Sequence, residues 1–216
     1  MRKRIEIAVG LDVGSAWTRV FVLSVEGGVM RYAGHGAAES TGWHRGQISD
    51  QTAVAGSIGD AVEAARKSSG YEIGSAVVGV GGPAIRSQQG RGVYDFGHSR
   101  RIGREDLAYA VKLAALAPRD DERVLLQVLP QDFTVDGQPP TLHPVNVECL
   151  RLEAHTLLIT ANAQEHQTLL SAVQQARIDV EETVFEAMAA AYACVLADER
   201  AGGVADRKST RLNSSH

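Results

Sequence analysis

A short run of small and acidic residues near the N-terminus has the chemistry of a phosphate and metal site. It reads Gly10-Leu11-Asp12-Val13-Gly14-Ser15-Ala16. Small residues at Gly14, Ser15 and Ala16 allow several backbone N–H groups to approach one phosphate. Asp12 can hold Mg²⁺ through the water shell of the ion. A plain β-hairpin turn favours the same residue types, so this run alone leaves both interpretations open.

A second acidic residue stands at the start of an alanine-rich segment, Glu186-Ala187-Met188-Ala189-Ala190-Ala191. Small side chains let such a helix press against another helix or against a nucleotide, and Glu186 at its start can position a water or a metal ion. From chemistry alone, a packed alanine helix with an exposed acid is the simpler interpretation.

A third glycine-rich run, Gly79-Val80-Gly81-Gly82-Pro83-Ala84, nominally matches a dinucleotide fingerprint. Pro83 and Gly90 fall where the required helix should follow, so the pyrophosphate would have no helix N-terminus to rest on. We therefore interpret this run as a hinge between subdomains. The sequence shows no phosphate loop with Lys, no nucleophile elbow and no zinc spacing, and it nominates no catalytic residue.

Composition restricts the classes of protein that these residues can belong to. The chain has 216 residues, 44% of them hydrophobic and 22% charged, with a net charge of -4. These values are ordinary for globular domains and argue against disorder or a coiled coil. The mild acidity predicts no nucleic-acid partner. Two cysteines indicate a reducing compartment, and the absence of an apolar run of about 18 residues favours a cytoplasmic chain.

The first third of the chain predicts an α/β arrangement that presents the Asp12 run at a hairpin tip. Strands are expected at 5–9, 18–25 and 29–33. A helix is expected from a cap at Ser49 or Asp50 to a stop at Gly70, because apolar residues recur at helical spacing between them. A strand at 73–80 follows.

The middle of the chain predicts a separate α+β subdomain at 84–161. We expect a polar, glycine-punctuated stretch at 85–101, a helix stopped by Pro118, and strands at 123–129, 133–135 and 152–160. The α/β pattern then returns with a helix capped by Asn162, a strand or extended link at 178–185, a helix at 186–196 and a further strand from Gly202. Residues 207–216 show no structural period and resemble a cloning scar, so the natural chain is expected to continue past Asp206.

In this order, the segments resemble the FtsA family of bacterial cell-division proteins, within the actin-like ATPase superfamily. The run around Asp12 is similar to that family's first phosphate motif, and the helix at Glu186 to its connecting helix. The segments most particular to the family are Val128-Leu129-Pro130-Gln131-Asp132-Phe133-Thr134-Val135-Asp136-Gly137 and Arg151-Leu152-Glu153-Ala154. Gly203-Val204-Ala205-Asp206 resembles the opening of the second phosphate motif.

The resemblance implies an actin-like (ribonuclease H-like) α/β domain formed by residues 1–83 and 162–206, with an inserted subdomain at 84–161 that mediates self-association. It implies that ATP and Mg²⁺ bind at Asp12, Gly14, Ser15, Ala16, Trp17, Glu186 and Asp206, with Asp12 holding the metal through water. It implies a protein that forms filaments and joins the FtsZ ring to the cytoplasmic face of the membrane at the division site. The FtsZ-binding subdomain and the C-terminal membrane helix are expected outside this chain, and ATP hydrolysis is expected to be weak or absent.

Trp17 departs from the family pattern. FtsA-like sequences usually carry Lys here, and that Lys would contact the terminal phosphates. A charge-assisted contact of this kind contributes roughly 1.5–3 kcal/mol, so Trp17 predicts weaker nucleotide binding. Two alternatives share the fold: a pilus-assembly platform of the PilM kind, and a sugar kinase-type phosphotransferase. The Leu129-Pro130-Gln131 segment favours FtsA over PilM, and no residue offers the acidic base that a kinase needs.

Overall fold

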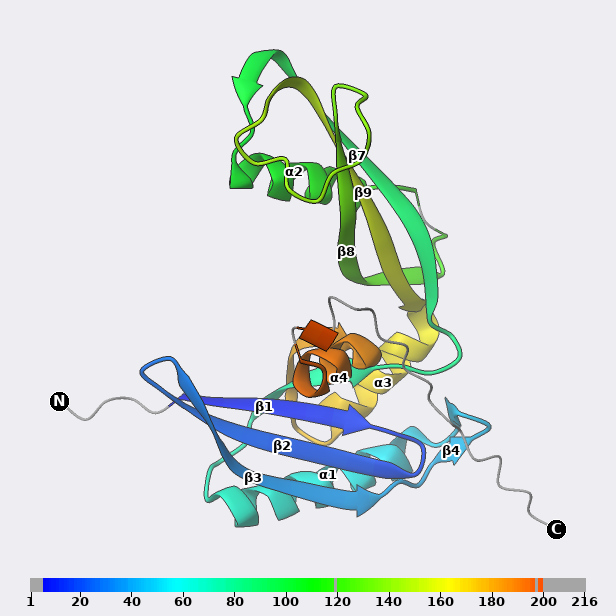
Figure 1. Ribbon diagram of the computed structural model, residues 1–216. Coiled ribbons are helices and arrows are strands. Elements are labelled where there is room, and N and C mark those ends of the chain that lie inside the picture. The colour runs from blue at the N-terminus through cyan, green and yellow to red at the C-terminus, as the bar shows by residue number, and fades with distance from the viewer. Residues whose placement is uncertain (1–5, 119, 197, 200–216) are drawn as a thin grey trace.

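The computed structural model describes residues 6–118, 120–196 and 198–199, which form two layered units (Figure 1). The first contains a five-stranded sheet with helices α1, α3 and α4. The second contains a three-stranded antiparallel sheet with helix α2 across it. The chain leaves the first unit after strand β6 and returns to it at helix α3, so the second unit is an insertion.

The five-stranded sheet has the order β10-β6-β1-β2-β3. Strands β1 (Glu6–Val13), β2 (Trp17–Glu26) and β3 (Val29–Glu39) form an antiparallel meander. Strands β6 (Ser75–Val80) and β10 (Asp179–Phe185) extend the sheet parallel to β1. The predicted hairpin is therefore confirmed, although β1 continues through the segment expected to be a turn.

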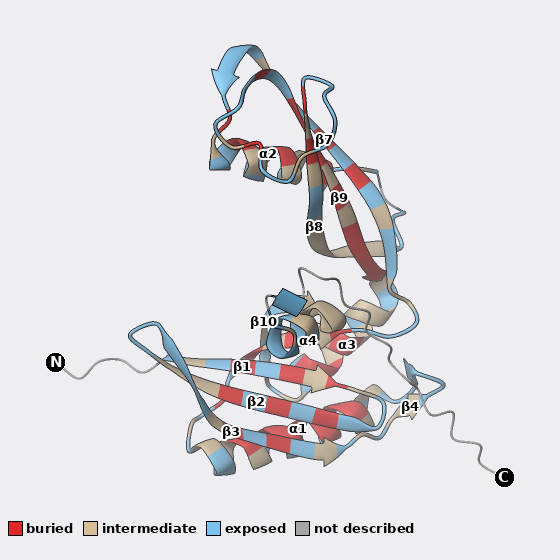
Figure 2. Ribbon diagram, viewed as in Figure 1, coloured by how far each residue is buried: buried red, intermediate tan, exposed pale blue. Residues whose placement is uncertain are grey.

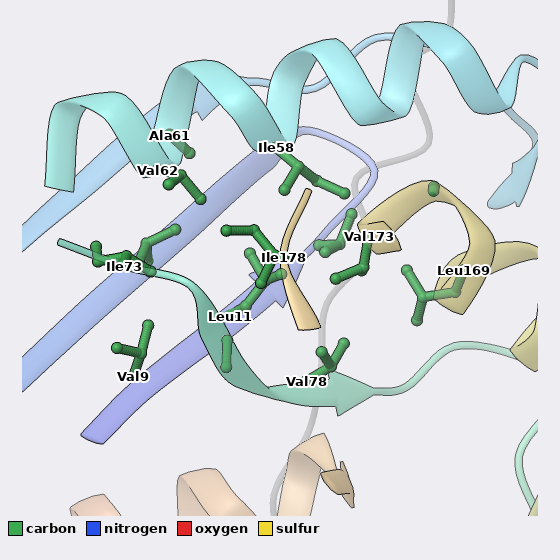
Figure 3. Close-up of a cluster of buried hydrophobic side chains, with 14 of the residues drawn as sticks. Val9, Leu11, Ile58, Ala61, Val62, Ile73, Val78, Leu169, Val173 and Ile178 are labelled. Carbon is green, nitrogen blue, oxygen red and sulfur yellow. The ribbon is translucent and has the colours of Figure 1, made fainter. Parts of the chain in front are cut away.

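One face of this sheet carries the core. Buried and exposed residues alternate along β1 and β2, as Figure 2 shows, because successive side chains of a strand point to opposite faces. Helix α1 (Gln51–Ser69) packs on the buried face with α3 beside it, and Figure 3 shows their apolar side chains meeting those of the strands. The fully or almost fully buried residues there include Leu11, Val20, Val22, Ile58, Ala61, Ile73, Val78, Val173 and Ile178.

Local sequence signals set the limits of α1 as predicted. The Asp50 side chain accepts a hydrogen bond from the Ala53 N–H at 3.0 Å, which satisfies one free donor of the first turn. Gly70 ends the helix with φ 73°, a left-handed conformation that glycine adopts without strain. A small hairpin of β4 (Trp43–His44) and β5 (Gln47–Ile48) precedes the helix.

The inserted unit pairs β7 (Arg86–Arg101), β9 (Glu148–Asn162) and β8 (Arg123–Val135) in that order, with α2 (Arg104–Ala114) on one face. The polar, glycine-punctuated stretch expected at 85–101, for which no element was predicted, forms a 16-residue strand. A Cβ at Gly92 would overlap the backbone of Ala110 and Ala114, and a Cβ at Gly90 would lie 2.9 Å from the Ala114 carbonyl oxygen. These glycines therefore allow α2 to approach β7 closely.

The chain re-enters the first unit through α3 (Ala163–Gln175), whose cap is the predicted Asn162. Its side-chain oxygen accepts a hydrogen bond from the Glu165 N–H at 3.0 Å. Strand β10 follows, and α4 (Glu186–Cys194) begins directly after it. The strand expected from Gly202, including Asp206, and the segment 207–216 lie outside the described residues. Among the described helices, none is long and apolar enough to cross a membrane.

Candidate functional site

Three parallel strands end together at one edge of the five-stranded sheet. Leu11 of β1 pairs with Val78 of β6, and Val78 pairs with Thr183 of β10, so the carboxyl ends of these strands lie side by side. In open α/β sheets, ligands bind at this edge, outside the carboxyl ends of the strands. Each of the three predicted runs with functional chemistry begins or ends here.

The hairpin tip between β1 and β2 is short and tightly closed. The Gly14 N–H donates a hydrogen bond to the Trp17 carbonyl at 3.1 Å, and a Cβ at Gly14 would lie 2.9 Å from that oxygen. Gly14 therefore shapes the turn, and its own N–H is already used. Ser15 and Ala16 are exposed, and within the described part of the chain no backbone hydrogen bond uses the N–H of either residue. The main-chain donors that this tip can offer to an anion are those of Ser15 and Ala16.

Asp12 lies on the sheet face opposite the core. It alternates with the buried residues Leu11 and Val13, and on β2 it pairs with Arg19 across the strands. The Arg19 Nη1 atom lies 3.7 Å from Asp12 Oδ2, and the two side chains are 48% and 43% exposed. The carboxylate is thus open enough to contact a hydrated ion, and it has a cation beside it.

Glu186 is brought to the same edge by β10. It is the first residue of α4, and its carboxylate lies against the loop that follows β6, because a Cβ at Gly81 would overlap it. A Cβ at Gly79 would meet only ordinary contacts, 3.7 Å from the Leu11 carbonyl oxygen and 3.9 Å from Glu186 Cγ. The prediction that Gly81 belongs to a hinge did not foresee this close approach to Glu186. The only sequence signal for it is that both residues directly follow apolar strands.

Trp17 stands at the start of β2, opposite Glu39 of β3, with 41% of its surface exposed. The loop after β3 supports the same corner, because the Ser40 N–H donates to the Ala16 carbonyl at 3.0 Å. The Ser40 and Thr18 hydroxyls also share a hydrogen bond of 2.9 Å. Trp17 is therefore available for stacking against a ligand at the tip.

This edge suits binding of a phosphorylated ligand better than covalent chemistry. It joins two carboxylates, one guanidinium and exposed amides at a hairpin tip, with the N-terminus of α4 adding a partial positive charge. Among the described residues, no group of three or more His, Cys, Asp or Glu side chains forms a metal cluster. A single carboxylate that holds a mostly hydrated ion fits Mg²⁺, which keeps several of its waters in proteins. Asp206 lies outside the described residues.

A cavity of about 240 Å³ lies where the inserted unit meets the first unit. The β4–β5 hairpin, the 80–85 segment and the first turns of α3 line it, and Gln47 donates a hydrogen bond to Glu165 across it at 2.8 Å. Burial lowers the pKa of His166, which also lines the cavity. The cavity thus lies at the junction between the units, and at Val80 and Gly81 it reaches the carboxyl end of β6.

Comparisons with known proteins agree with this architecture. Residues 82–160 match the family model described as the SHS2 domain inserted in FtsA. The chain is 32% identical over 200 residues to the cell division protein FtsA of Borreliella burgdorferi, and 30% identical over 201 residues to that of Bacillus subtilis. These matches cover 92% and 93% of this chain but 48% and 46% of the relatives, so the chain spans about half their length.

A solved structure of a PilM-PilN type IV pilus biogenesis complex contains a chain with a similar fold. The TM-score is 0.55 at 14% identity, over 86% of this chain and 49% of that chain. At this identity the likeness concerns the fold alone. Together with the FtsA matches, it confirms the predicted actin-like fold with an inserted subdomain and the predicted resemblance to FtsA.

Proposed function

We propose that this chain is part of an ATP-binding, actin-like cell-division protein of the FtsA kind and carries one side of its nucleotide site. Its relatives are named cell division proteins, which supports a role in division. The observation that carries the nucleotide proposal is the convergence of Asp12, the Ser15–Ala16 tip and Glu186 at the carboxyl ends of three parallel strands. In this proposal the two carboxylates described at this edge, Asp12 and Glu186, serve the metal and its water, so neither is assigned as the base that a phosphotransferase to a sugar hydroxyl would require.

In this proposal, each residue has a distinct part in holding ATP. The exposed amides of Ser15 and Ala16 donate to phosphate oxygens, with Gly14 keeping the turn closed. Asp12 holds Mg²⁺ through water, and the metal neutralises phosphate charge. Glu186 orders a water or the metal shell from the start of α4, and Trp17 packs against the ligand. Asp206, in the segment that resembles the second phosphate motif, would also contribute to nucleotide binding.

The proposed partners follow from the two-unit layout and from the resemblance. The inserted unit, 84–161, provides the surface for self-association into filaments. FtsZ and the cytoplasmic face of the membrane are contacted through segments outside this chain. Hydrolysis of ATP is weak or absent, so nucleotide binding serves assembly.

Isothermal titration of the complete gene product with ATP and Mg²⁺ tests the nucleotide proposal. Wild-type protein should bind ATP, and Asp12→Asn should weaken the binding only when Mg²⁺ is present. The exposed Asp12–Arg19 pair contributes at most about 1 kcal/mol to folding, so urea denaturation should show Asp12→Asn to be nearly as stable as wild type. A wild-type protein that binds no ATP at millimolar concentration would overturn the proposed function.

A further inference from the structure

The proposed nucleotide edge carries two carboxylates, and a triphosphate that entered it would meet their negative charge. Asp12 and Glu186 both lie there, and position 17, where the resemblance to FtsA implies a lysine, holds Trp17. A magnesium ion neutralises only part of a triphosphate. A side-chain cation at this edge would therefore favour ATP over nucleotides with fewer phosphates.

Arg19 is placed to supply that cation. Along β2 the exposed residues Trp17, Arg19 and Phe21 alternate with the buried Thr18 and Val20. Arg19 is thus on the same sheet face as Trp17, one side-chain repeat farther from the tip. The Arg19 Nη1 atom lies 3.7 Å from Oδ2 of Asp12, which is one residue before the carboxyl end of β1.

The chemistry of arginine suits this position. Its planar guanidinium carries five N–H donors that match phosphate oxygens in pairs, and it stays charged at any physiological pH. An ion pair with both members about half exposed contributes little to folding. The small contribution of this ion pair to the stability of the fold therefore does not account well for the position of Arg19 beside Asp12.

We propose that Arg19 is the phosphate-binding cation of this site and replaces the lysine missing at position 17. This inference rests on the proposed ATP site. When ATP enters with Mg²⁺, Asp12 turns to the hydrated metal, and the Arg19 guanidinium donates to the terminal phosphates. Trp17 is then free to pack beside the ligand.

Titration calorimetry of the complete gene product tests the proposal with ATP and AMP, which differ in the terminal phosphates. Arg19→Ala should weaken ATP binding about 10- to 100-fold, the range of one charge-assisted contact, and should change AMP binding less than twofold. Arg31→Ala removes the same charge at the far end of the β2–β3 ladder, where Arg31 pairs with Ser24. This control should bind ATP as wild type does.

A second variant separates a phosphate contact from a structural ion pair. Trp17→Lys in the Arg19→Ala background restores a cation at the edge without restoring the pair to Asp12, and it should recover at least tenfold of the lost ATP affinity. Equal ATP binding by wild type and Arg19→Ala overturns this inference alone. Equal losses for ATP and AMP, or no rescue by the lysine, also overturn it. Absence of ATP binding by wild type overturns the proposed function and this inference together.

Discussion

Replacing Gly81 with alanine should displace the Glu186 carboxylate from the nucleotide edge while leaving the fold intact. A Cβ at Gly81 would overlap this carboxylate and lie 3.1 Å from its Cδ. The obstructing atoms are the end of a flexible side chain, and Gly81 is not among the residues with positive φ. Glu186 can therefore rotate aside at a cost of about 1 kcal/mol. The Glu186 carboxylate would then lose its charge-assisted hydrogen bond to the water or metal shell that it is proposed to order. This loss should weaken the binding of ATP with Mg²⁺ by about 1.5–3 kcal/mol, or one to two orders of magnitude.

Gly79→Ala is the matched control, because it adds the same methyl group to the same end of the sheet. Its nearest atoms, the Leu11 carbonyl oxygen at 3.7 Å and Glu186 Cγ at 3.9 Å, are at ordinary contact distances. Titration calorimetry with ATP and Mg²⁺ and urea denaturation should be run on both variants of the complete gene product. Gly79→Ala should match wild type in affinity. If both variants lose the same affinity, or if Gly81→Ala binds as wild type does, the role assigned to Glu186 is refuted.

Four further predictions concern the inserted unit and the isolated chain. Gly92→Ala should lower the free energy of unfolding by about 2–3 kcal/mol, because the added methyl group meets the backbone of α2. The control Val93→Ala lies in the same strand but on the outer face, and it should lower the free energy of unfolding by less than about 1 kcal/mol. Urea denaturation measures both values. The hydrogen bond and charge of Arg91 hold the pKa of Glu153 below its ordinary value of 4.5. The ionised Glu153 therefore stabilises the folded state above that pH, and this stabilisation is lost as the pH falls through the lowered pKa. Glu153→Gln should therefore make the unfolding free energy less dependent on pH in acid. Deleting 84–161 should abolish filaments of the complete protein in electron micrographs, and unchanged filaments would contradict the self-association role. The 216-residue chain by itself should bind ATP poorly, and micromolar affinity in calorimetry would contradict this expectation.

Local signals in the sequence identified most of the elements of the first unit. Asp50 and Gly70 predict the two ends of α1 because the hydrogen bond of the N-cap and the left-handed glycine at the C-cap each involve only residues within one turn of the helix end. The same holds for Asn162 at α3. The α/β class and the hairpin around Asp12 were predictable for the same reason.

Contacts between distant segments account for what the sequence did not reveal. Glycine is typical of turns, yet Gly90 and Gly92 lie in a long strand. The backbone of α2 packs so closely on this strand that side chains at these two positions would overlap it. The approach of Gly81 to Glu186 depends on the pairing of β6 with β10, which neither residue's neighbours specify. The ion pair of Arg19 with Asp12 likewise appears only when the register of β1 and β2 is known.

A structure of the complete protein with ATP and Mg²⁺ tests the central claim most directly. The proposed site predicts the triphosphate against the main chain of Ser15 and Ala16, with the hydrated metal beside Asp12. A triphosphate bound elsewhere, away from residues 12–16, would contradict the proposed mechanism even if the protein acts in cell division.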